Sequence, residues 1–426
     1  MKIGIVAPPW IAVPPPAYGG TEEVVDGLAR GLRARGHDVM LFTVGDSTCP
    51  VDRRWYFEHC VTPMGTGIAE AAHAVAAYEE LSGCEVIHDH TTLGPLLCAD
   101  RVPPGVALVA TNHNPFTPMA RMLYGAMSRR VALVAISGNH RSTAPELDAT
   151  VIHHGIDLER FAAGPGDGGY LLFIGRMTPG KGPERAIRIA RAAGKPLVMA
   201  AKAREPEEQD FFRAEVEPLL GPDVTLVGEA TVAERIGLLQ HALAVVNPIC
   251  WPEPFGLVMT EALACGTPVL SFPAGAAPEI VQDGVTGFLE DDEDGLTEAV
   301  GHLSEIDRRA CRLRAEEHFS MERMATDHER LYARVYAATR HPSPGSGVAG
   351  VDPPPGRDHA DCVARPGPVR SATATATAQV DGSYGPRRPD QGQVGRQAVD
   401  GPVCTGEVDR EHRTTEREAA DPQRNQ

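Results

Sequence analysis

Short apolar runs alternate with segments of helical periodicity over the first 340 residues of the chain. Residues 2–7 form an apolar run of strand length, and a loop rich in proline and glycine follows it. Apolar side chains then recur at helical spacing, at Val24, Val25, Leu28 and Leu32. Further strands are predicted at residues 38–44, 86–88, 106–111 and 131–137. Strands that alternate with helices predict an α/β fold with parallel sheets covered by helices on both faces.

A second series of strands and helices begins after a glycine-rich segment. Residues 164–169 have the sequence GPGDGG, which predicts an interdomain linker. Strands are then predicted at residues 170–175, 196–200, 224–227, 244–248 and 268–271, with a helix from about residue 183 and helical material over residues 296–336. We therefore predict two α/β domains, residues 1–160 and 161–318.

The composition of the chain changes after residue 341. Proline, glycine, arginine, aspartate and threonine dominate, hydrophobic periodicity ends, and residues 371–379 form a short Ala/Thr repeat. Such a segment cannot bury enough apolar surface to offset the entropy lost on folding. We expect residues 341–426 to be a disordered low-complexity tail, and we assign it no function.

Because the chain as a whole is acidic, the positions of its individual basic residues are informative about phosphate binding. The formal net charge is −17, so the chain lacks a general attraction for nucleic acid, and no nucleic-acid partner is expected. A phosphate-bearing substrate would then need local positive charge. Only four of the 40 basic residues are lysines, at positions 2, 181, 195 and 202. Where arginine is used almost everywhere, a retained lysine in a loop suggests a compact ammonium group placed for a phosphate.

Cysteine usage and the N-terminus indicate a cytoplasmic protein. The nine cysteines form no C-x-x-C pair and no zinc-site spacing, and several lie in apolar runs, where a reduced thiol behaves as a small hydrophobe. The first apolar run carries one basic residue and stops at Pro8, so we interpret it as a strand and not as a signal peptide. No apolar stretch reaches the roughly 18 residues that a membrane span needs.

The strongest chemical signal is the segment EPFGLVMTE at residues 253–261. Glu253 lies in a Pro/Gly loop, and Glu261 lies inside an apolar helix start, where a carboxylate costs stability unless it has a partner. Phe255, Gly256 and Leu257 occupy the helix N-terminus, where free backbone amides favour an anion. The alternative is a capping carboxylate and a solvated glutamate, and the segment alone does not separate the two readings.

A second signal is the loop GRMTPGKG at residues 175–182, between a buried strand and a helix. Arg176 and Lys181 bracket this loop at the carboxyl end of a strand, where α/β sheets bind ligands. Lys202 is a weaker candidate for the same anion. Near the N-terminus, Gly19 and Gly20 precede a helix and let the backbone approach a phosphate. They lack the G-x-G-x-x-G spacing of a dinucleotide site, which counts against an NAD enzyme.

Histidines gather near predicted strand ends, in His88-Asp89-His90, at His113 and in His153-His154. A histidine at such an end is well placed to face a ligand, although a structural role is the commoner one. No i,i+4 pair or carboxylate partner makes these histidines convincing metal ligands, so no metal site is predicted. The acidic run at residues 290–294 is interpreted as a solvated loop, and residues 121–130 as an amphipathic helix with a basic edge.

Taken together, these residues resemble the retaining glycosyltransferase family 4, whose members have the GT-B fold. The similar segments follow one another in order, at Gly19-Gly20, His90, His113, 155–157, 175–182, 253–261, 266–269, 275–281 and 284–288. Each is weak alone, and the ordered set is specific. The segment WPEPFG and the lysine at position 202 are similar to a branch that includes antibiotic-biosynthetic transferases.

The resemblance implies two Rossmann-like domains facing across a cleft, with residues 319–340 as a closing helix that returns to the first domain. It also implies a nucleoside diphosphate sugar as co-substrate, no cofactor, and a small molecule, glycan or lipid as acceptor. Arg176 and Lys181 would neutralise the donor diphosphate, with Gly19 and Gly20 closing over it. Glu261 would bind the ribose hydroxyls. Glu253, with the amides of Phe255 and Gly256, would orient the donor sugar, and His113 would lie beside the reacting sugar.

Two departures and two alternatives accompany this resemblance. His154 stands where the family often has asparagine, and Lys202 stands where a small residue is usual. A GT-B epimerase or hydrolase acting on sugar nucleotides is the first alternative, and it would need acid and base carboxylates in the cleft. The second is a non-catalytic protein that binds sugar nucleotides. The donor base, the sugar, the acceptor and the oligomeric state do not follow from the sequence, and a peripheral membrane contact stays open.

Overall fold

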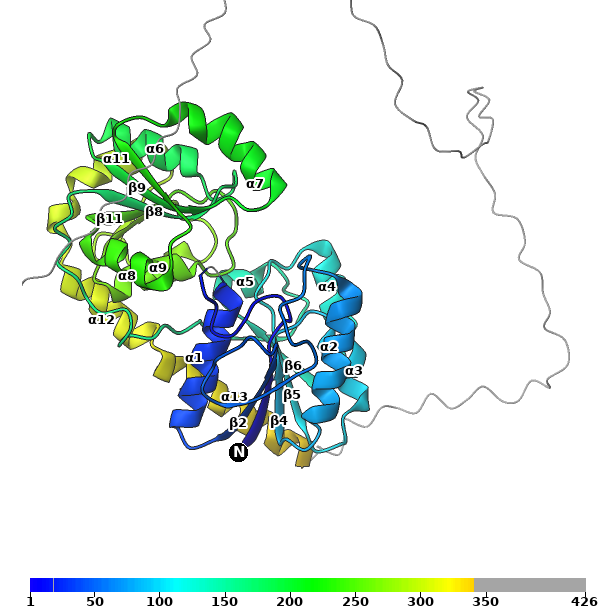
Figure 1. The fold of residues 1–426 in the computed structure, drawn as a ribbon. Coiled ribbons are helices and arrows are strands. Elements are labelled where there is room, and N and C mark those ends of the chain that lie inside the picture. Colours follow the sequence, from blue (N-terminus) through cyan, green and yellow to red (C-terminus); the bar gives the residue numbers. More distant parts are fainter. Residues whose placement is uncertain (18, 341–426) are drawn as a thin grey trace, which may run out of the picture. The chain divides into compact units, whose positions relative to one another are not determined.

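The computed structural model describes residues 1–17 and 19–340, and these belong to one compact unit. The tail expected over residues 341–426 lies outside the described residues. Two parallel sheets form the framework of this unit, each with helices on both faces (Figure 1). The boundary proposed between residues 160 and 161 falls in the segment that joins the last strand of the first sheet to the first strand of the second.

The first sheet has seven parallel strands in the order β3-β2-β1-β4-β5-β6-β7. Their bounds are β1 Lys2–Val6, β2 Asp38–Thr43, β3 Asp52–Trp55, β4 Val86–Asp89, β5 Ala107–Thr111, β6 Val131–Ala135 and β7 Ala149–Val151. Alternate residues of each strand point to opposite faces, so Ile3 and Ile5 pack with α1 (Gly20–Ala34), whereas Val6 packs with α2 (Gly67–Glu80). The remaining helices of this domain are α3 Gly94–Cys98, α4 Pro118–Gly125 and α5 Gly138–Ser142.

The second sheet has six parallel strands in the order β10-β9-β8-β11-β12-β13. Their bounds are β8 Leu171–Arg176, β9 Leu197–Lys202, β10 Val224–Gly228, β11 Ala244–Asn247, β12 Val269–Ser271 and β13 Gly287–Leu289. The helices around it are α6 Pro183–Ala192, α7 Pro206–Phe211, α8 Val232–His241, α9 Leu257–Ala264, α10 Ala277–Ile280, α11 Glu293–Gly301 and α12 Arg308–His318. In both sheets the strand order reverses beside the first strand, which creates a crevice at the carboxyl ends of the strands.

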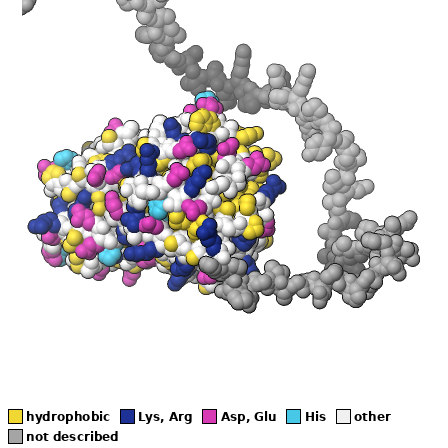
Figure 2. Space-filling model, turned by 90° about the horizontal axis from the view of Figure 1, so that it is seen from below, with side chains coloured by type: hydrophobic (Ala, Val, Ile, Leu, Met, Phe, Trp, Pro, Cys, Tyr) yellow, Lys and Arg dark blue, Asp and Glu magenta, His cyan; other side chains and the backbone are white. Residues whose placement is uncertain are grey.

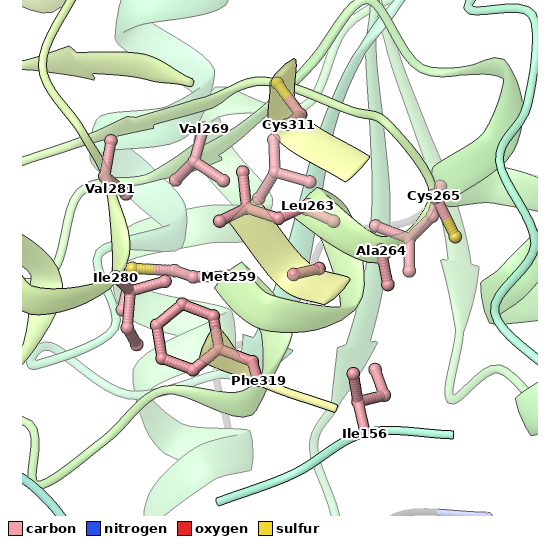
Figure 3. Packing of buried hydrophobic residues seen from close by; sticks show 14 of the residues in the cluster. Ile156, Met259, Leu263, Ala264, Cys265, Val269, Ile280, Val281, Cys311 and Phe319 are labelled. Carbon is pink, nitrogen blue, oxygen red and sulfur yellow. The ribbon is translucent and has the colours of Figure 1, made fainter. Parts of the chain in front are cut away.

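Helix α9 is the most deeply enclosed helix in the second domain. Every residue from Met259 to Ala264 is buried, because β11 and β12 cover one side of the helix and α12 covers another. Met259, Leu263 and Phe319 pack together in this core (Figure 3). Burial of each such side chain contributes roughly 1.5–3 kcal/mol to folding. A helix enclosed in this way is fixed in position, so its N-terminus presents the 253–257 segment in a defined place.

The final helix joins the two domains. Helix α13 (Met321–Arg340) packs against α1 and β5, and Tyr332 is fully buried in the core of the first domain. Just before it, Ile156 pairs with Ser320 in a parallel bridge, so the two chain crossings between the domains run side by side. A Cβ atom at Gly155 would lie 2.6 Å from the Ser320 carbonyl oxygen, so only glycine allows this close approach.

Some local predictions were wrong. The helix expected over residues 121–130 is α4, which ends at Gly125, so Arg129 and Arg130 lie beyond it. The acidic run at 290–294 is not only a solvated loop, because Asp292 caps α11 and accepts a hydrogen bond from the Gly295 N–H at 2.8 Å. Strands β3, β7 and β13 were not predicted. They have only three or four residues each and lie at sheet edges, so they carry no distinct apolar run.

Candidate functional site

Two basic side chains of the second domain lie side by side at the carboxyl ends of its strands. Arg176 and Lys202 are the last residues of β8 and β9, and their Cα atoms are direct partners in the strand register. Both side chains lie near Glu208, with nitrogen–oxygen distances of 3.8 Å. Glu208 is buried and caps α7 by accepting a hydrogen bond from the N-cap Glu205 N–H at 3.4 Å, and it accepts another from the Arg204 N–H at 3.0 Å. Arg176 and Lys202 therefore lie around one buried carboxylate, that of Glu208, at these strand ends.

Lys181 and Glu253 form a close ion pair in the candidate site. The Nζ atom of Lys181 lies 2.8 Å from both carboxylate oxygens of Glu253, and both side chains are 14% exposed. The ammonium group also lies 5.9 Å from the centre of the Trp251 ring. The sequence analysis placed these two residues in separate segments with separate roles. The structure brings them together, so any ligand charge at this point meets a cation and an anion at once.

The backbone around Glu253 is held by a glycine contact. The Glu253 carbonyl accepts a hydrogen bond from the Ala276 N–H at 3.0 Å. Gly275 has φ near +60°, and a Cβ atom there would lie 2.4 Å from the backbone N and O atoms of Glu253. A side chain at position 275 would therefore push the Glu253 loop away.

The N-terminus of α9 lies against the N-terminus of α1. Gly256 is the N-cap of α9 with φ of 97°, and the first N–H groups of a helix have no partner within it. Gly19 is the N-cap of α1, and a Cβ atom at Gly20 would lie 3.2 Å from Cδ1 of Leu257. Two helix N-termini, one from each domain, thus converge beside the Lys181–Glu253 pair. Their partial positive charges favour an anion between them.

Glu261 has the partner that its buried position demands, and that partner is Arg235 on α8. The Nε atom of Arg235 lies 3.0 Å from Oε2 of Glu261, without the angles of a hydrogen bond. Burial raises the pKa of Glu261 to about 7, and the charge of Arg235 opposes that rise. A small pocket opens beside Arg235 at the carboxyl ends of β8, β9 and β10, lined by Ile174, Gly175, Ala200, Lys202, Glu229, Ala230 and Arg235.

The sequence analysis missed Arg235, although a signal was present. Val232 and Leu239 are buried on α8, and Arg235 lies three residues after Val232 on the same helical stripe. A charged residue on the apolar stripe of a helix must find a partner in the interior. The stripe predicts that a partner exists, whereas the identity of that partner depends on how α8 and α9 pack.

His113 and His90 lie together at the crevice edge of the first sheet. Nδ1 of His90, directly after β4, is 2.8 Å from Nε2 of His113, after β5. The His113 ring stacks on His154 with 5.1 Å between ring centres, and His154 meets Phe255 edge-on at 5.0 Å. Phe255 immediately precedes the α9 N-cap, so the histidines of the first domain reach the N-terminal end of α9 in the second.

The Glu279 carboxylate, in the second domain, contacts the first domain near the same site. Its carboxylate accepts hydrogen bonds from the Gly138 and Asn139 N–H groups of the first domain, at 2.8 and 2.7 Å. His153 lies 2.8 Å from the same carboxylate. The Ser137 hydroxyl adds a 2.7 Å hydrogen bond to the Pro254 carbonyl. From the sequence, Glu279 is only one residue of a segment similar to the family, because nothing local reveals a partner 140 residues away.

Other features of the described residues bear on the class of ligand. No group of three or more His, Cys, Asp or Glu residues in the described part is arranged to hold a metal ion. None of the helices within residues 1–17 and 19–340 is long and apolar enough to span a bilayer. On the face shown in Figure 2, basic and acidic side chains are interspersed.

Comparison with known proteins gives two adjoining family matches. Residues 18–160 match the model described as Glycosyltransferase Family 4, and residues 156–317 match the model described as Glycosyl transferases group 1. The chain is 31% identical over 219 residues to D-inositol 3-phosphate glycosyltransferase of Mycobacterium leprae, a match that covers 46% of each protein. The matched region thus spans about half the length of that relative.

Two further relatives match over almost their whole length. Alpha-maltose-1-phosphate synthase of Mycobacterium tuberculosis is 28% identical over 387 residues, which cover 76% of this chain and 97% of that protein. Among solved structures, AviGT4, a glycosyltransferase involved in avilamycin A biosynthesis, is 28% identical with a TM-score of 0.60. That match covers 79% of this chain and 98% of the other. The alignable region therefore includes both sheets and the site between them.

Proposed function

This chain belongs to the family 4-like glycosyltransferases of GT-B fold, and on that premise we propose that it transfers a hexose-type sugar from a nucleoside diphosphate sugar. The observation that carries this proposal is the convergence of the α1 and α9 N-termini beside Lys181, with Arg176 and Lys202 at the adjoining strand ends. Fixed cations and helix N-termini at one point suit a diphosphate leaving group.

In this proposal, different residues bind different parts of the donor. Arg176, Lys181 and the backbone at Gly19 and Gly20 neutralise the diphosphate as negative charge grows on it. Glu261, held beside Arg235, accepts hydrogen bonds from the ribose hydroxyls. We place the base on the side of Arg235 where the small pocket opens at the ends of β8 to β10. Glu253 and the α9 N-terminus orient the sugar.

In the reaction, an acceptor hydroxyl oxygen bonds to the anomeric carbon while the bond from that carbon to the diphosphate oxygen breaks. The departing diphosphate takes the proton of the acceptor hydroxyl, and the products are the glycosylated acceptor and the nucleoside diphosphate. We propose attack on the face from which the diphosphate leaves, so that the anomeric configuration is retained. We also propose that the protein cations make a divalent ion unnecessary, because they already supply the charge that Mg²⁺ supplies in other enzymes.

Glu253 argues against the epimerase or hydrolase alternative. Such an enzyme needs a carboxyl group free to give or take a proton, whereas both oxygens of Glu253 lie at 2.8 Å from the Lys181 ammonium. A carboxylate held in this way by an ammonium group is placed to accept a hydrogen bond from the donor sugar.

A binding and product experiment tests the proposal. The purified full chain is titrated in a thermal-shift panel with UDP, GDP, ADP and dTDP, with and without Mg²⁺. We expect a saturable shift with one nucleotide that is indifferent to Mg²⁺. The matching sugar nucleotides are then supplied with candidate acceptors, and the anomeric configuration of the product is read by NMR. No shift with any nucleotide in folded protein contradicts the phosphate roles, and an inverted product contradicts the retaining mechanism.

A further inference from the structure

The contact between His90 and His113 fixes which ring nitrogen carries the proton on each residue. A neutral imidazole has one N–H donor and one bare acceptor nitrogen. Nδ1 of His90 and Nε2 of His113 are 2.8 Å apart, so one of them donates to the other. The second nitrogen of His90, Nε2, is buried and has no hydrogen-bond partner among the described residues. The position of the proton on His90 therefore decides the direction of the bond.

In two other buried histidines, His73 and His328, one ring nitrogen also lacks a hydrogen-bond partner, and its protonation can be assigned. Nδ1 of His328 lies 3.0 Å from the Met324 carbonyl oxygen, and Nε2 of His73 lies 2.9 Å from the Ala7 carbonyl oxygen. A carbonyl oxygen only accepts, so both of these nitrogens carry the proton. Burial lowers the pKa of each ring to about 4, so each is neutral and its other nitrogen is bare. In both residues that bare nitrogen is the buried, unpartnered one.

His90 should likewise leave its unpartnered nitrogen bare, for a reason of free energy. A buried N–H group without a partner is the rarer and costlier defect, whereas an unpaired acceptor is tolerated more often. The proton of His90 therefore lies on Nδ1 and is donated to Nε2 of His113. Burial lowers the pKa of His113 to about 3, which keeps its ring neutral. With Nε2 accepting, the single proton of His113 must lie on Nδ1.

Nδ1 of His113 is the nitrogen left for a ligand. No hydrogen bond joins it to any described residue, and the ring is half-buried between His90 and His154. The ring thus has an N–H group available, and His154 separates it from Phe255 at the α9 N-terminus.

We propose that His90 is a positioning residue that locks His113 in the Nδ1–H form, so that His113 donates a hydrogen bond to an oxygen of the donor sugar. This inference rests on the proposed function for the identity of the ligand. It excludes His113 as a proton acceptor in the transfer, because the nitrogen with the free electron pair is already occupied by His90.

The tautomer is measurable without any substrate. The full chain is labelled with ¹⁵N-histidine, and His113 is assigned by comparison with the His113→Asn variant. We expect a protonated, pyrrole-type Nδ1 and a bare, pyridine-type Nε2 at neutral pH. The opposite pattern overturns the proposal, whatever the activity of the protein.

A matched pair of variants tests the role of His90. In His90→Asn, the amide nitrogen replaces Nδ1 as the donor to His113, so the tautomer and the transfer rate should be kept to within about threefold. In His90→Asp, where an oxygen replaces that NH₂ group, a carboxylate accepts from Nε2–H of His113 and the tautomer reverses. We then expect kcat/KM to fall about tenfold, the effect of one lost hydrogen bond, with unchanged affinity for the free nucleoside diphosphate.

Each outcome of this pair has a defined meaning. Equal transfer by the two variants, with reversed tautomers, overturns the donor role of His113. If His90→Asp does not fold, the wild-type spectrum together with the activity of His90→Asn still decides the proposal. If the spectrum is as expected but no sugar nucleotide is turned over by the wild type, the proposed function fails and the tautomer assignment stands.

Discussion

Arg235 and Glu261 face each other across 3.0 Å inside the second domain, and the carboxyl group has a pKa of about 7 because it is buried. Only its ionised form would accept the two ribose hydrogen bonds that we propose for it. The affinity for the nucleoside diphosphate should therefore rise as the pH rises through about 7.

Replacing Arg235 by methionine should shift that pH dependence. Loss of the cation raises the pKa of Glu261 further, so affinity at pH 7 should fall about fivefold for the first added pKa unit and about tenfold for each further unit. Titration calorimetry between pH 6 and 9 measures the shift, and the ionisation of the ligand cancels between the two proteins. Arg191→Met is the control, since Arg191 pairs with Asp223 on the exposed surface. Identical pH profiles for wild type and Arg235→Met would remove the proposed coupling.

Lys181→Ala should lower transfer more than it lowers stability. The variant removes the proposed charge-assisted contact to the diphosphate, which would be worth roughly 1.5–3 kcal/mol and correspond to about 10- to 100-fold in kcat/KM. It also leaves Glu253 without its cation. Lys195→Ala is a matched control, because Lys195 is exposed and lies before the amino end of β9, whereas Lys181 follows the carboxyl end of β8. Unchanged turnover in Lys181→Ala would rule out its role in binding the diphosphate.

Gly275→Ala should impair transfer by displacing Glu253. A Cβ atom at position 275 would lie 2.4 Å from the Glu253 backbone, and we expect a loss of about tenfold or more in kcat/KM. Gly284→Ala separates this clash from backbone strain, since Gly284 has φ of +68° but nothing within 4 Å of the added atom. Both variants should lose about 1 kcal/mol of stability from the left-handed conformation. Equal activities of the two would mean that the Glu253 loop tolerates the shift.

Glu22→Gln should stabilise the protein at alkaline pH. Glu22 is 4% exposed, and burial raises its pKa from 4.5 to about 7. Between these values the folded state binds more protons than the unfolded state, so the free energy of unfolding falls as the pH rises from 4.5 to 7. The variant cannot lose that proton.

Denaturant unfolding at pH 5 and pH 8 tests this expectation. At pH 8 the variant should be more stable than wild type by on the order of 2 kcal/mol, and the difference should shrink towards pH 5. Glu80→Gln, at the exposed end of α2, should show no such pH-dependent gain. A constant difference between wild type and Glu22→Gln at both pH values would contradict the linkage.

Sequence periodicity predicted most of the framework. The alternation of apolar runs with helical stripes located β1, β2 and β8 and placed Arg176 and Lys181 at a strand end, because these features depend on neighbouring residues. It failed for β3, whose sequence DRRW has no apolar run. Edge strands form by pairing with a neighbour already in place, and that neighbour lies elsewhere in the chain.

The sequence by itself determined the kinds of group available to the site and the elements that carry them: a lysine in a glycine loop, glutamates flanking a helix N-terminus, and histidines after strands. Only the tertiary structure decided which of them meet. Lys181 and Glu253 are 72 positions apart, His90 and His113 are 23 apart, and Arg235 reaches Glu261 from a different helix. Such contacts follow from the strand order and from how α8 packs on α9, and these arise from the packing of the whole core.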